Sequence, residues 1–465
     1  MKIEDIIHKL NKEIKYCHFK SNEHLSASFN GETDFDFLIH KNDIYKFQKL
    51  VIDLGFKRRV STVDKQYFGM EDYICFDSEN GKLYHFHVHY QLIFGKKYSK
   101  NYVLDMNNIL WSNLKMDKEY NIPIPIPEIE LILLILRIGL KTGTNLKTVA
   151  KIMLGRNILP KNLLDEFNYL DKQIDETKFT EITKHFNIEY KYFYQIFRAL
   201  KNNQTNKIYF LYSKNKLTKS LSEYKILSKK QNIQTKKLRK CAKINSGSWL
   251  NTIGTTIAFV GCDGAGKSTI VNEINKWLSW KISVKQIYMG RPKKYPNRIK
   301  IFAKINNTLK YLGYKGLINV LEEQRFLYHA NERRMNYFNS LKFKQSGKIV
   351  IFDRYPLKEF WSMNEPMDGP RILSNSNNSN KEKNIYSAIK EPDLLFLLNV
   401  EIEESLRRKK TQGIKEDRII IERKYNAIQK VIMQKSNQDN VCVIDAMRPY
   451  NEVLLEIKRK IWKTI

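Results

Sequence analysis

The spacing of apolar positions changes along the chain. In residues 1–120, short apolar runs alternate with stretches of helical spacing, and this mixture predicts an α/β segment. Residues 121–211 have helical spacing. Pro127 suits a helix start, and the stretch behind it is apolar nearly all round, which is typical of a buried helix. We therefore expect a helical extension that packs on the first domain.

The second half of the chain alternates short apolar runs with helical stretches, which predicts an α/β domain over residues 254–465. Strands separated by helices favour a doubly wound parallel sheet with right-handed crossovers, and ligands then lie at the carboxyl ends of the strands. Two of the expected strands end in carboxylates, Asp353 and Asp445. The expected strands cover residues 257–260, 283–288, 348–353, 392–400 and 441–445.

A glycine-rich loop follows the first of these strands. Residues 261–268 fit the pattern G-x-x-x-x-G-K-S between a strand and an amphipathic helix, which is the required context of a phosphate-binding P-loop. Main-chain N–H groups and the helix end would point at phosphate oxygens, Lys267 would reach the β- and γ-phosphates, and Ser268 would hold Mg²⁺. The expected nucleotide-binding residues are Gly261, Cys262, Asp263, Gly264, Ala265, Gly266, Lys267, Ser268 and Thr269.

The half from residue 254 to 465 resembles the thymidylate kinase family of nucleoside-monophosphate kinases. The matching pieces are the P-loop, Asp353-Arg354-Tyr355, an arginine-rich segment around Gly413, and Ile444-Asp445-Ala446. The resemblance implies ATP as donor and Mg²⁺ as cofactor, with Asp353 holding the metal or its water. It further implies that Arg354 touches the acceptor phosphate and Asp263 an acceptor hydroxyl. The arginine-rich segment around Gly413 would form a mobile lid that supplies Arg407, Arg408 and Arg418.

Phosphoryl transfer needs in-line placement and positive charge on the transferred group, and a lid that excludes water. Simpler interpretations stay open. The lid arginines could form i,i+4 charge pairs on an exposed helix, and Asp353 with Arg354 could be a structural ion pair. Asp445 fits a structural role better than a catalytic one.

The expected acceptor pocket departs from the family pattern. Thymidylate kinases continue the Asp-Arg-Tyr motif with a Ser-x-x-Ala-Tyr-Gln-like helix, whereas this chain continues with residues 356–361 and then a segment that contains Asp368 and Arg371. By sequence, the acceptor pocket is therefore not the thymidylate one. We expect the acceptor to be a nucleoside monophosphate or another small phosphorylated or hydroxyl compound. One alternative is a kinase of a sugar or surface-glycan intermediate. Another is an ATP-regulated protein that binds nucleic acid or membrane.

The first 120 residues resemble the nucleotidyltransferase superfamily through a glycine turn followed by Asp34-Phe35-Asp36 and an apolar run. Strand periodicity places Asp34 and Asp36 on one face, the start of a two-metal site. The family takes a third carboxylate from a later strand, but the strand expected at residues 82–91 offers only His85, His87 and His89. Either a histidine replaces that third ligand, or Glu71 or Asp72 substitutes for it. Otherwise this α+β domain has lost catalysis and only binds its ligand.

The amino-acid composition constrains the function less than the motifs do. The net charge of +32 invites a nucleic-acid or membrane partner, but basic residues are spread along the chain, so biased composition is the favoured explanation. Residues 214–243, within an expected linker at 212–253, hold eleven Lys or Arg and one acid, which favours a solvated connector or basic helix over an anionic contact. Scattered cysteines and a charged N-terminus without an apolar core predict a cytoplasmic protein. The oligomeric state stays open, and a homodimer is one of the alternatives.

Overall fold

The computed structural model describes residues 2–141, 159–185, 190–201, 207–242, 247–250, 253–292, 301, 305, 315–362, 368–372, 377–411, 413 and 417–465. The chain divides into two compact units, Met1–Ser246 and Gly247–Ile465, which are described one at a time. Among the described residues, no helix combines the length and the apolar character needed to cross a bilayer.

The N-terminal unit is built on a mixed sheet whose strands run in the order β1-β2-β5-β4-β3. Strands β2 and β5 pair in parallel, and the other neighbours are antiparallel. One face is apolar because alternate side chains, such as Phe35 and Phe37, lie in a core with α1 and α3. The strands are β1 (Tyr16–His18), β2 (Phe35–Ile39), β3 (Lys57–Ser61), β4 (Met70–Phe76), β5 (Leu83–His89), β6 (Leu92–Phe94), β7 (Tyr102–Leu104), β8 (Leu114–Met116) and β9 (Pro123–Pro125).

Helices complete this unit. The helix predicted from Pro127 is α5, and most of its side chains are buried in a core shared with α7, α8, α9 and α10, which confirms the predicted buried helix. The described residues of the expected basic linker at 212–253 include the end of α10, all of α11 and β10. The helices are α1 (Ile3–Glu13), α2 (Leu25–Phe29), α3 (Ile44–Asp53), α4 (Asn107–Ser112), α5 (Pro127–Lys141), α7 (Lys161–Asp171), α8 (Glu176–Lys184), α9 (Tyr190–Lys201), α10 (Lys207–Ser220) and α11 (Lys229–Ala242).

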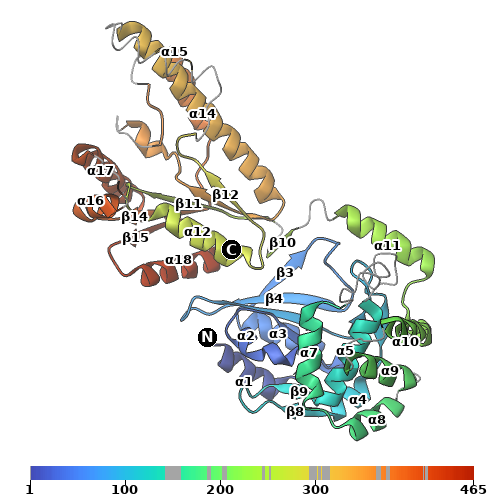
Figure 1. The fold of residues 1–465 in the computed structure, drawn as a ribbon. Helices are drawn as coiled ribbons and strands as arrows, with labels where there is room; N and C mark the ends of the chain where they lie inside the picture. Colours follow the sequence, from blue (N-terminus) through green and yellow to red (C-terminus); the bar gives the residue numbers. More distant parts are fainter. Residues whose placement is uncertain are drawn as a thin grey trace. The chain divides into compact units, whose positions relative to one another are not determined.

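The C-terminal unit holds the parallel sheet that the sequence predicts, in the order β12-β13-β11-β14-β15. One face packs on α14, α15 and α17, while α12 and α18 lie together on the other side (Figure 1). The strands are β10 (Ser248–Trp249), β11 (Thr256–Gly261), β12 (Val284–Tyr288), β13 (Ile349–Asp353), β14 (Leu394–Asn399) and β15 (Val441–Asp445). The helices are α12 (Lys267–Ser279), α14 (Lys315–Gln345), α15 (Asn377–Ser387), α16 (Ile402–Thr411), α17 (Arg418–Lys435) and α18 (Tyr450–Thr464).

Candidate active site

The glycine-rich loop joins the fully buried strand β11 to α12. Gly264 and Gly266 have φ of 86° and 81°, a left-handed conformation that residues with a Cβ rarely adopt. A Cβ on Gly264 would also lie 2.8 Å from the main-chain oxygen of Ser405. The loop therefore requires glycine for its own conformation and for its close approach to α16.

Lys267 begins α12 and folds back into the loop. Its ammonium donates to the carbonyl oxygens of Gly261 at 3.0 Å and Cys262 at 2.7 Å. Burial, followed by the neighbouring charge of Arg354, lowers the pKa of Lys267. A cation held with so little water interacts more strongly with an incoming phosphate than an exposed one would.

Ser268 and Asp353 meet at the carboxyl ends of β11 and β13. The Ser268 hydroxyl donates to Asp353 Oδ2 at 2.8 Å. The other carboxylate oxygen, Oδ1, is buried and has no hydrogen-bond partner among the described residues. A hydroxyl and a carboxylate with one unused oxygen are hard oxygen donors of the kind that Mg²⁺ prefers, so these two residues fit the expected metal.

Asp263 is the centre of a cluster of charges. It accepts from Arg354 at 3.0 Å and from Lys424 of α17, a partner that the sequence did not reveal. Burial raises the pKa of Asp263, but Lys267, Arg354 and Lys424 outweigh burial and hold it below its usual value. Arg354 has a φ of 72°, which is strained for a residue with a Cβ. The position of the Arg354 side chain beside the loop is thus fixed by its left-handed backbone conformation and by its hydrogen bond to Asp263.

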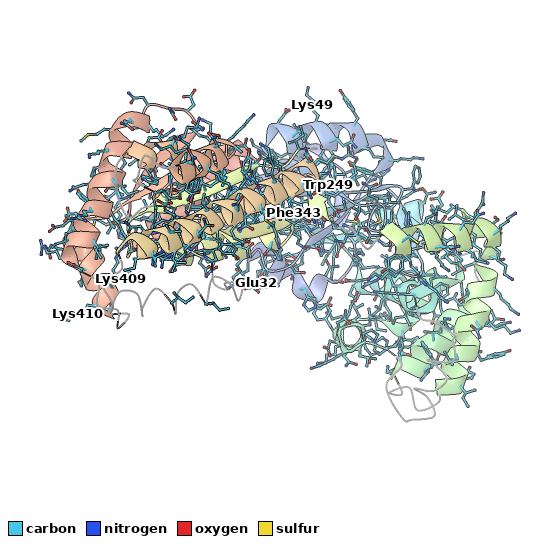
Figure 2. All side chains as sticks on the ribbon, turned by 90° about the horizontal axis from the view of Figure 1, so that it is seen from above. Glu32, Lys49, Trp249, Phe343, Lys409 and Lys410 are labelled. Atoms are coloured by element: carbon cyan, nitrogen blue, oxygen red, sulfur yellow. The ribbon has the colours of Figure 1, made fainter. Side chains whose placement is uncertain are left out.

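The structure treats the three predicted lid arginines differently. Arg408 donates to the carbonyl oxygen of Ala446 at 2.9 Å and lines a cavity of 350 Å³ beside the P-loop. Neither Arg407 nor Arg418 is among the described residues lining this cavity. All three arginines form ion pairs: Arg407 and Arg408 with Glu404, and Arg418 with Glu403 and Glu422. Lys409 and Lys410 follow at the end of α16 (Figure 2). Residues 412 and 414–416 of the predicted lid lie outside the described residues.

A family model, thymidylate kinase, matches residues 259–457. The C-terminal half is a thymidylate kinase-like domain. The chain is 26% identical over 234 residues to the uncharacterized ATP-binding protein YghR of Escherichia coli strain K12, covering 45% of this chain and 88% of that protein. It is 25% identical over 213 residues to probable thymidylate kinase 1 of Saccharolobus solfataricus, covering 45% and 97%. A structure of deoxyadenosine kinase from M. mycoides matches at 19% identity and a TM-score of 0.32, covering 45% and 100%.

The other side of the kinase-like domain's charge cluster is also rich in guanidinium groups. Buried Arg333 of α14 donates to Asp368 and to the Tyr386 hydroxyl, both at 2.5 Å, and Arg354 lies 3.6 Å from the other oxygen of Asp368. Burial, followed by Arg333, Arg325, Arg371 and Arg291, lowers the pKa of His329 to about 3. This side therefore brings several arginines and one carboxylate, Asp368, around the neutral His329. The sequence marked Asp368 and Arg371 but gave no sign that Arg333 would be buried.

Asp445 takes no part in this arrangement of the kinase-like domain. It ends β15 as predicted, but its side chain is exposed, and Oδ1 accepts from the main-chain N–H of Met447 at 2.9 Å. This hydrogen bond fits the structural role expected for Asp445.

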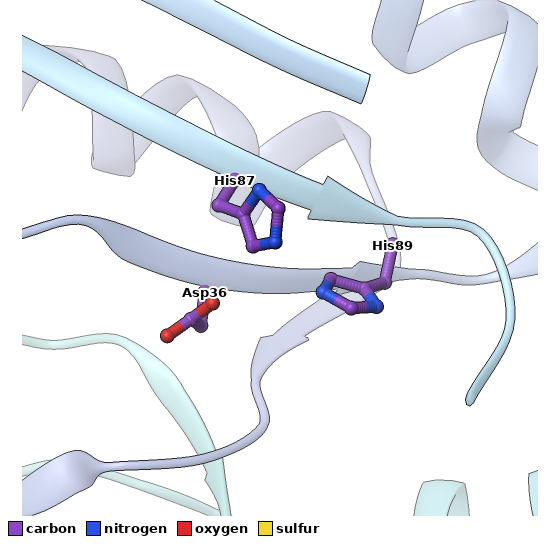
Figure 3. Close-up of side chains that lie close together, drawn as sticks. All are labelled: Asp36, His87 and His89. Carbon is purple, nitrogen blue, oxygen red and sulfur yellow. The ribbon is translucent and has the colours of Figure 1, made fainter. Parts of the chain in front are cut away.

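In the N-terminal unit, the expected carboxylates meet histidines on the sheet. Asp36 and His87 are direct neighbours in the β2–β5 register, and His89 lies next to them (Figure 3). One ligand atom from each of the three lies within 4.8 Å of the others, so they could hold a metal ion. Asp34 lies instead 2.9 Å from His85 Nδ1. The three histidines thus belong to a largely buried cluster, rather than to an open polar face.

Strand β4 supplies the acid that β5 lacks. Asp72 Oδ1 lies 3.0 Å from His85 Nε2 and 2.8 Å from His87 Nδ1. The sequence left open whether Glu71 or Asp72 would come near. Glu71 turns the other way and accepts from Tyr73 at 2.6 Å. Strand alternation separates the two, because neighbouring side chains point to opposite faces.

Proposed function

We propose that the kinase-like domain is a phosphotransferase that moves the γ-phosphate of ATP, with Mg²⁺, to a small acceptor. The observation that carries the proposal is the hydrogen bond from Ser268 to Asp353 beside Lys267, with one buried carboxylate oxygen left for a metal. An ATP-binding protein and thymidylate kinases among its relatives support ATP as the donor.

The proposed roles follow from where charge develops. In phosphoryl transfer, negative charge spreads over the oxygens of the transferred group, so fixed cations stabilise the transition state. The P-loop and Lys267 would hold the donor phosphates, and Ser268 with Asp353 would hold the metal. Arg354 and Arg408 would contact the transferred and acceptor groups. Arg407 and Arg418 would join them only when the lid closes.

The acceptor in this proposal is anionic. Arg291, Arg325, Arg333 and Arg371 all act on the buried His329, and an anionic acceptor would interact with these arginines more favourably than an uncharged sugar would. Nucleoside monophosphates and sugar phosphates both satisfy this requirement. An unphosphorylated nucleoside or sugar satisfies it less well.

The test is an acceptor screen with the full chain, reading ADP release with Mg²⁺ and ATP. The panel pairs each phosphorylated compound with its unphosphorylated form: dTMP with thymidine, and a hexose phosphate with its hexose. We expect turnover with at least one phosphorylated member, abolished by Lys267→Ala and retained by Asp439→Asn, which removes an exposed carboxylate. Acceptor-independent ADP release in every case would contradict the proposal. The proposal would also be contradicted if ATP only changed the affinity of the protein for DNA or lipid vesicles.

We also propose that residues 1–120 form a nucleotidyltransferase-like domain. The supporting observation is the gathering of Asp34, Asp36 and Asp72 on neighbouring strands through His85 and His87. Transfer of a nucleoside monophosphate should then be lost in Asp36→Asn while ADP release by the kinase-like domain persists. Loss of neither activity, or of both together, would count against this second proposal.

A further inference from the structure

A cationic cavity of 310 Å³ lies in the N-terminal unit. Among the described residues that line it, five carry positive charge and none is a carboxylate. The aromatic side chains of Phe19, Tyr67 and Phe94 form apolar parts of its wall. The five basic residues are Lys20, Lys97, Lys100, Arg137 and Lys141.

These cations come from three separate parts of the unit: the end of β1, the β6–β7 loop and α5. Two have acidic partners, since Lys20 lies 2.9 Å from Asp36 and Arg137 lies 2.6 Å from Glu166. The other three, Lys97, Lys100 and Lys141, form no ion pair with a described carboxylate. Gathering like charges at one place costs free energy, which an anion bound between them would recover.

Lys100 is the most constrained of the three lysines without an ion pair, and its ammonium donates to Met70 Sδ at 3.2 Å. Burial, followed by the charge of Lys20, lowers the pKa of Lys100 to about 7. Its φ of 40° is left-handed, and its loop is tight, because a Cβ on Gly95 would lie 2.9 Å from the main-chain nitrogen of Asn101. The Lys100 ammonium lies 4.5 Å from the centre of the Tyr67 ring. The fold thus holds a poorly hydrated ammonium at the cavity without a carboxylate beside it.

His89 gives an independent indication of a ligand. It is 3% exposed and lines the cavity, and neither ring nitrogen has a hydrogen-bond partner among the described residues. In any protonation state an imidazole ring offers at least one N–H donor. A buried polar group without a partner costs free energy, and a ligand oxygen would remove that cost.

We propose that this cavity binds a small molecule that carries phosphate groups, with Lys100 and His89 as contacts and the aromatic wall against its organic part. The volume lies within the range of small-molecule sites, which are largely apolar with a few convergent polar groups. Lysine binds phosphate as a point charge, so several lysines suit a polyphosphate. The site belongs to the N-terminal unit and does not depend on the proposed kinase activity.

The test uses pyrophosphate as the probe and isothermal titration calorimetry on the full chain. Because the P-loop also binds phosphates, every sample carries Lys267→Ala and no magnesium is added, at constant ionic strength. We expect one pyrophosphate per chain. Lys100→Met should weaken binding by at least about tenfold, the loss expected for one charge-assisted contact.

Lys49→Met is the matched control, because Lys49 is an exposed lysine of α3 in the same unit (Figure 2). Removing the desolvated ammonium of Lys100 should not unfold the unit, which circular dichroism checks. If that variant does not fold, Lys141→Met, at the end of α5, takes its place. No binding to the Lys267→Ala chain would overturn the proposal. Unchanged affinity in the cavity variant, or an equal loss in Lys49→Met, would overturn it too.

Discussion

At the residue scale, Asp353 has two carboxylate oxygens with different environments. Oδ2 accepts from Ser268, whereas Oδ1 is buried without a partner among the described residues. Asparagine preserves the volume and can still accept from Ser268, but it is a much weaker metal ligand. Asp353→Asn should therefore leave folding intact while lowering kcat for ADP release by about 100-fold or more.

The measurement is ADP release as a function of Mg²⁺ concentration, with thermal unfolding as the check on folding. The matched control is Asp439→Asn, the same change at an exposed position. A normal response to Mg²⁺ in Asp353→Asn would show that this carboxylate does not hold the metal.

Lys100 gives a prediction about pH. Its pKa in the free protein is about 7, lowered from the ordinary value mainly by burial and then by Lys20. Lys141, Asp36 and Asp72 are the other charged groups involved: Lys141 lowers this pKa, and the two carboxylates raise it. The ammonium is therefore present below pH 7 and is lost above it. An anion that needs this charge must restore the proton at higher pH, which weakens binding.

The observable is the ratio of the pyrophosphate dissociation constants of Lys100→Met and its parent, because the ratio cancels the titration of pyrophosphate itself. The ratio should be largest at pH 6.5 and fall by at least about threefold by pH 8.5. A ratio that stays constant, or rises with pH, would mean that the Lys100 ammonium does not contact the anion.

The sequence could locate these residues only where the pattern is local. Lys267, Ser268 and Asp353 follow from motifs at strand ends. Asp72 could not be assigned, because it meets His87 through the register of two antiparallel strands, which no local pattern encodes. Similarly, Arg407 and Arg408 are adjacent in sequence but about 100° apart around α16, so only the packing of that helix decides which one reaches the cavity.

At the scale of elements, the P-loop unit was predicted closely. The expected strand at 257–260 is β11 (Thr256–Gly261), and the amphipathic helix expected after the loop is α12 (Lys267–Ser279). A short buried strand, a glycine turn and an amphipathic helix carry strong local signals. The pairing of β4 with β5 and the burial of Arg333 depend on contacts between distant segments, and such contacts leave no local signal.

The close approach of the P-loop to α16 gives a prediction for Gly264. Alanine there must adopt a φ of 86° and place a Cβ 2.8 Å from a main-chain oxygen. Gly264→Ala should destabilise the C-terminal unit by at least about 1 kcal/mol and weaken ATP binding. The control is Gly316→Ala on the exposed side of α14, where an added Cβ meets nothing within 4 Å.

Alanine is favoured over glycine by about 1 kcal/mol in a helix interior and by less in the first turn, where Gly316 lies, so the Gly316 variant should keep or slightly raise the melting temperature. The two variants are compared by thermal unfolding and by ATP titration. If both shift the melting temperature in the same direction by the same amount, the close approach of Gly264 to α16 is not what matters.

At the scale of the whole molecule, each compact unit has its own hydrophobic core. Separate cores allow separate unfolding, so calorimetry of the full chain should resolve two transitions. A ligand stabilises only the unit that binds it. A non-hydrolysable ATP analogue with Mg²⁺, at about 100 times its dissociation constant, adds about 2.7 kcal/mol to that unit. For a unit of this size the shift is about 5–10 °C.

The two proposed sites make this experiment more specific. The ATP analogue should raise one transition, and Lys267→Ala should cancel that shift. In the Lys267→Ala chain, pyrophosphate without magnesium should raise the other transition, and Lys100→Met should cancel that second shift. A single transition that moves as a whole with either ligand would show that the units unfold together. Pyrophosphate and the ATP analogue raising the same one of two transitions would show that the N-terminal cavity is not the site bound.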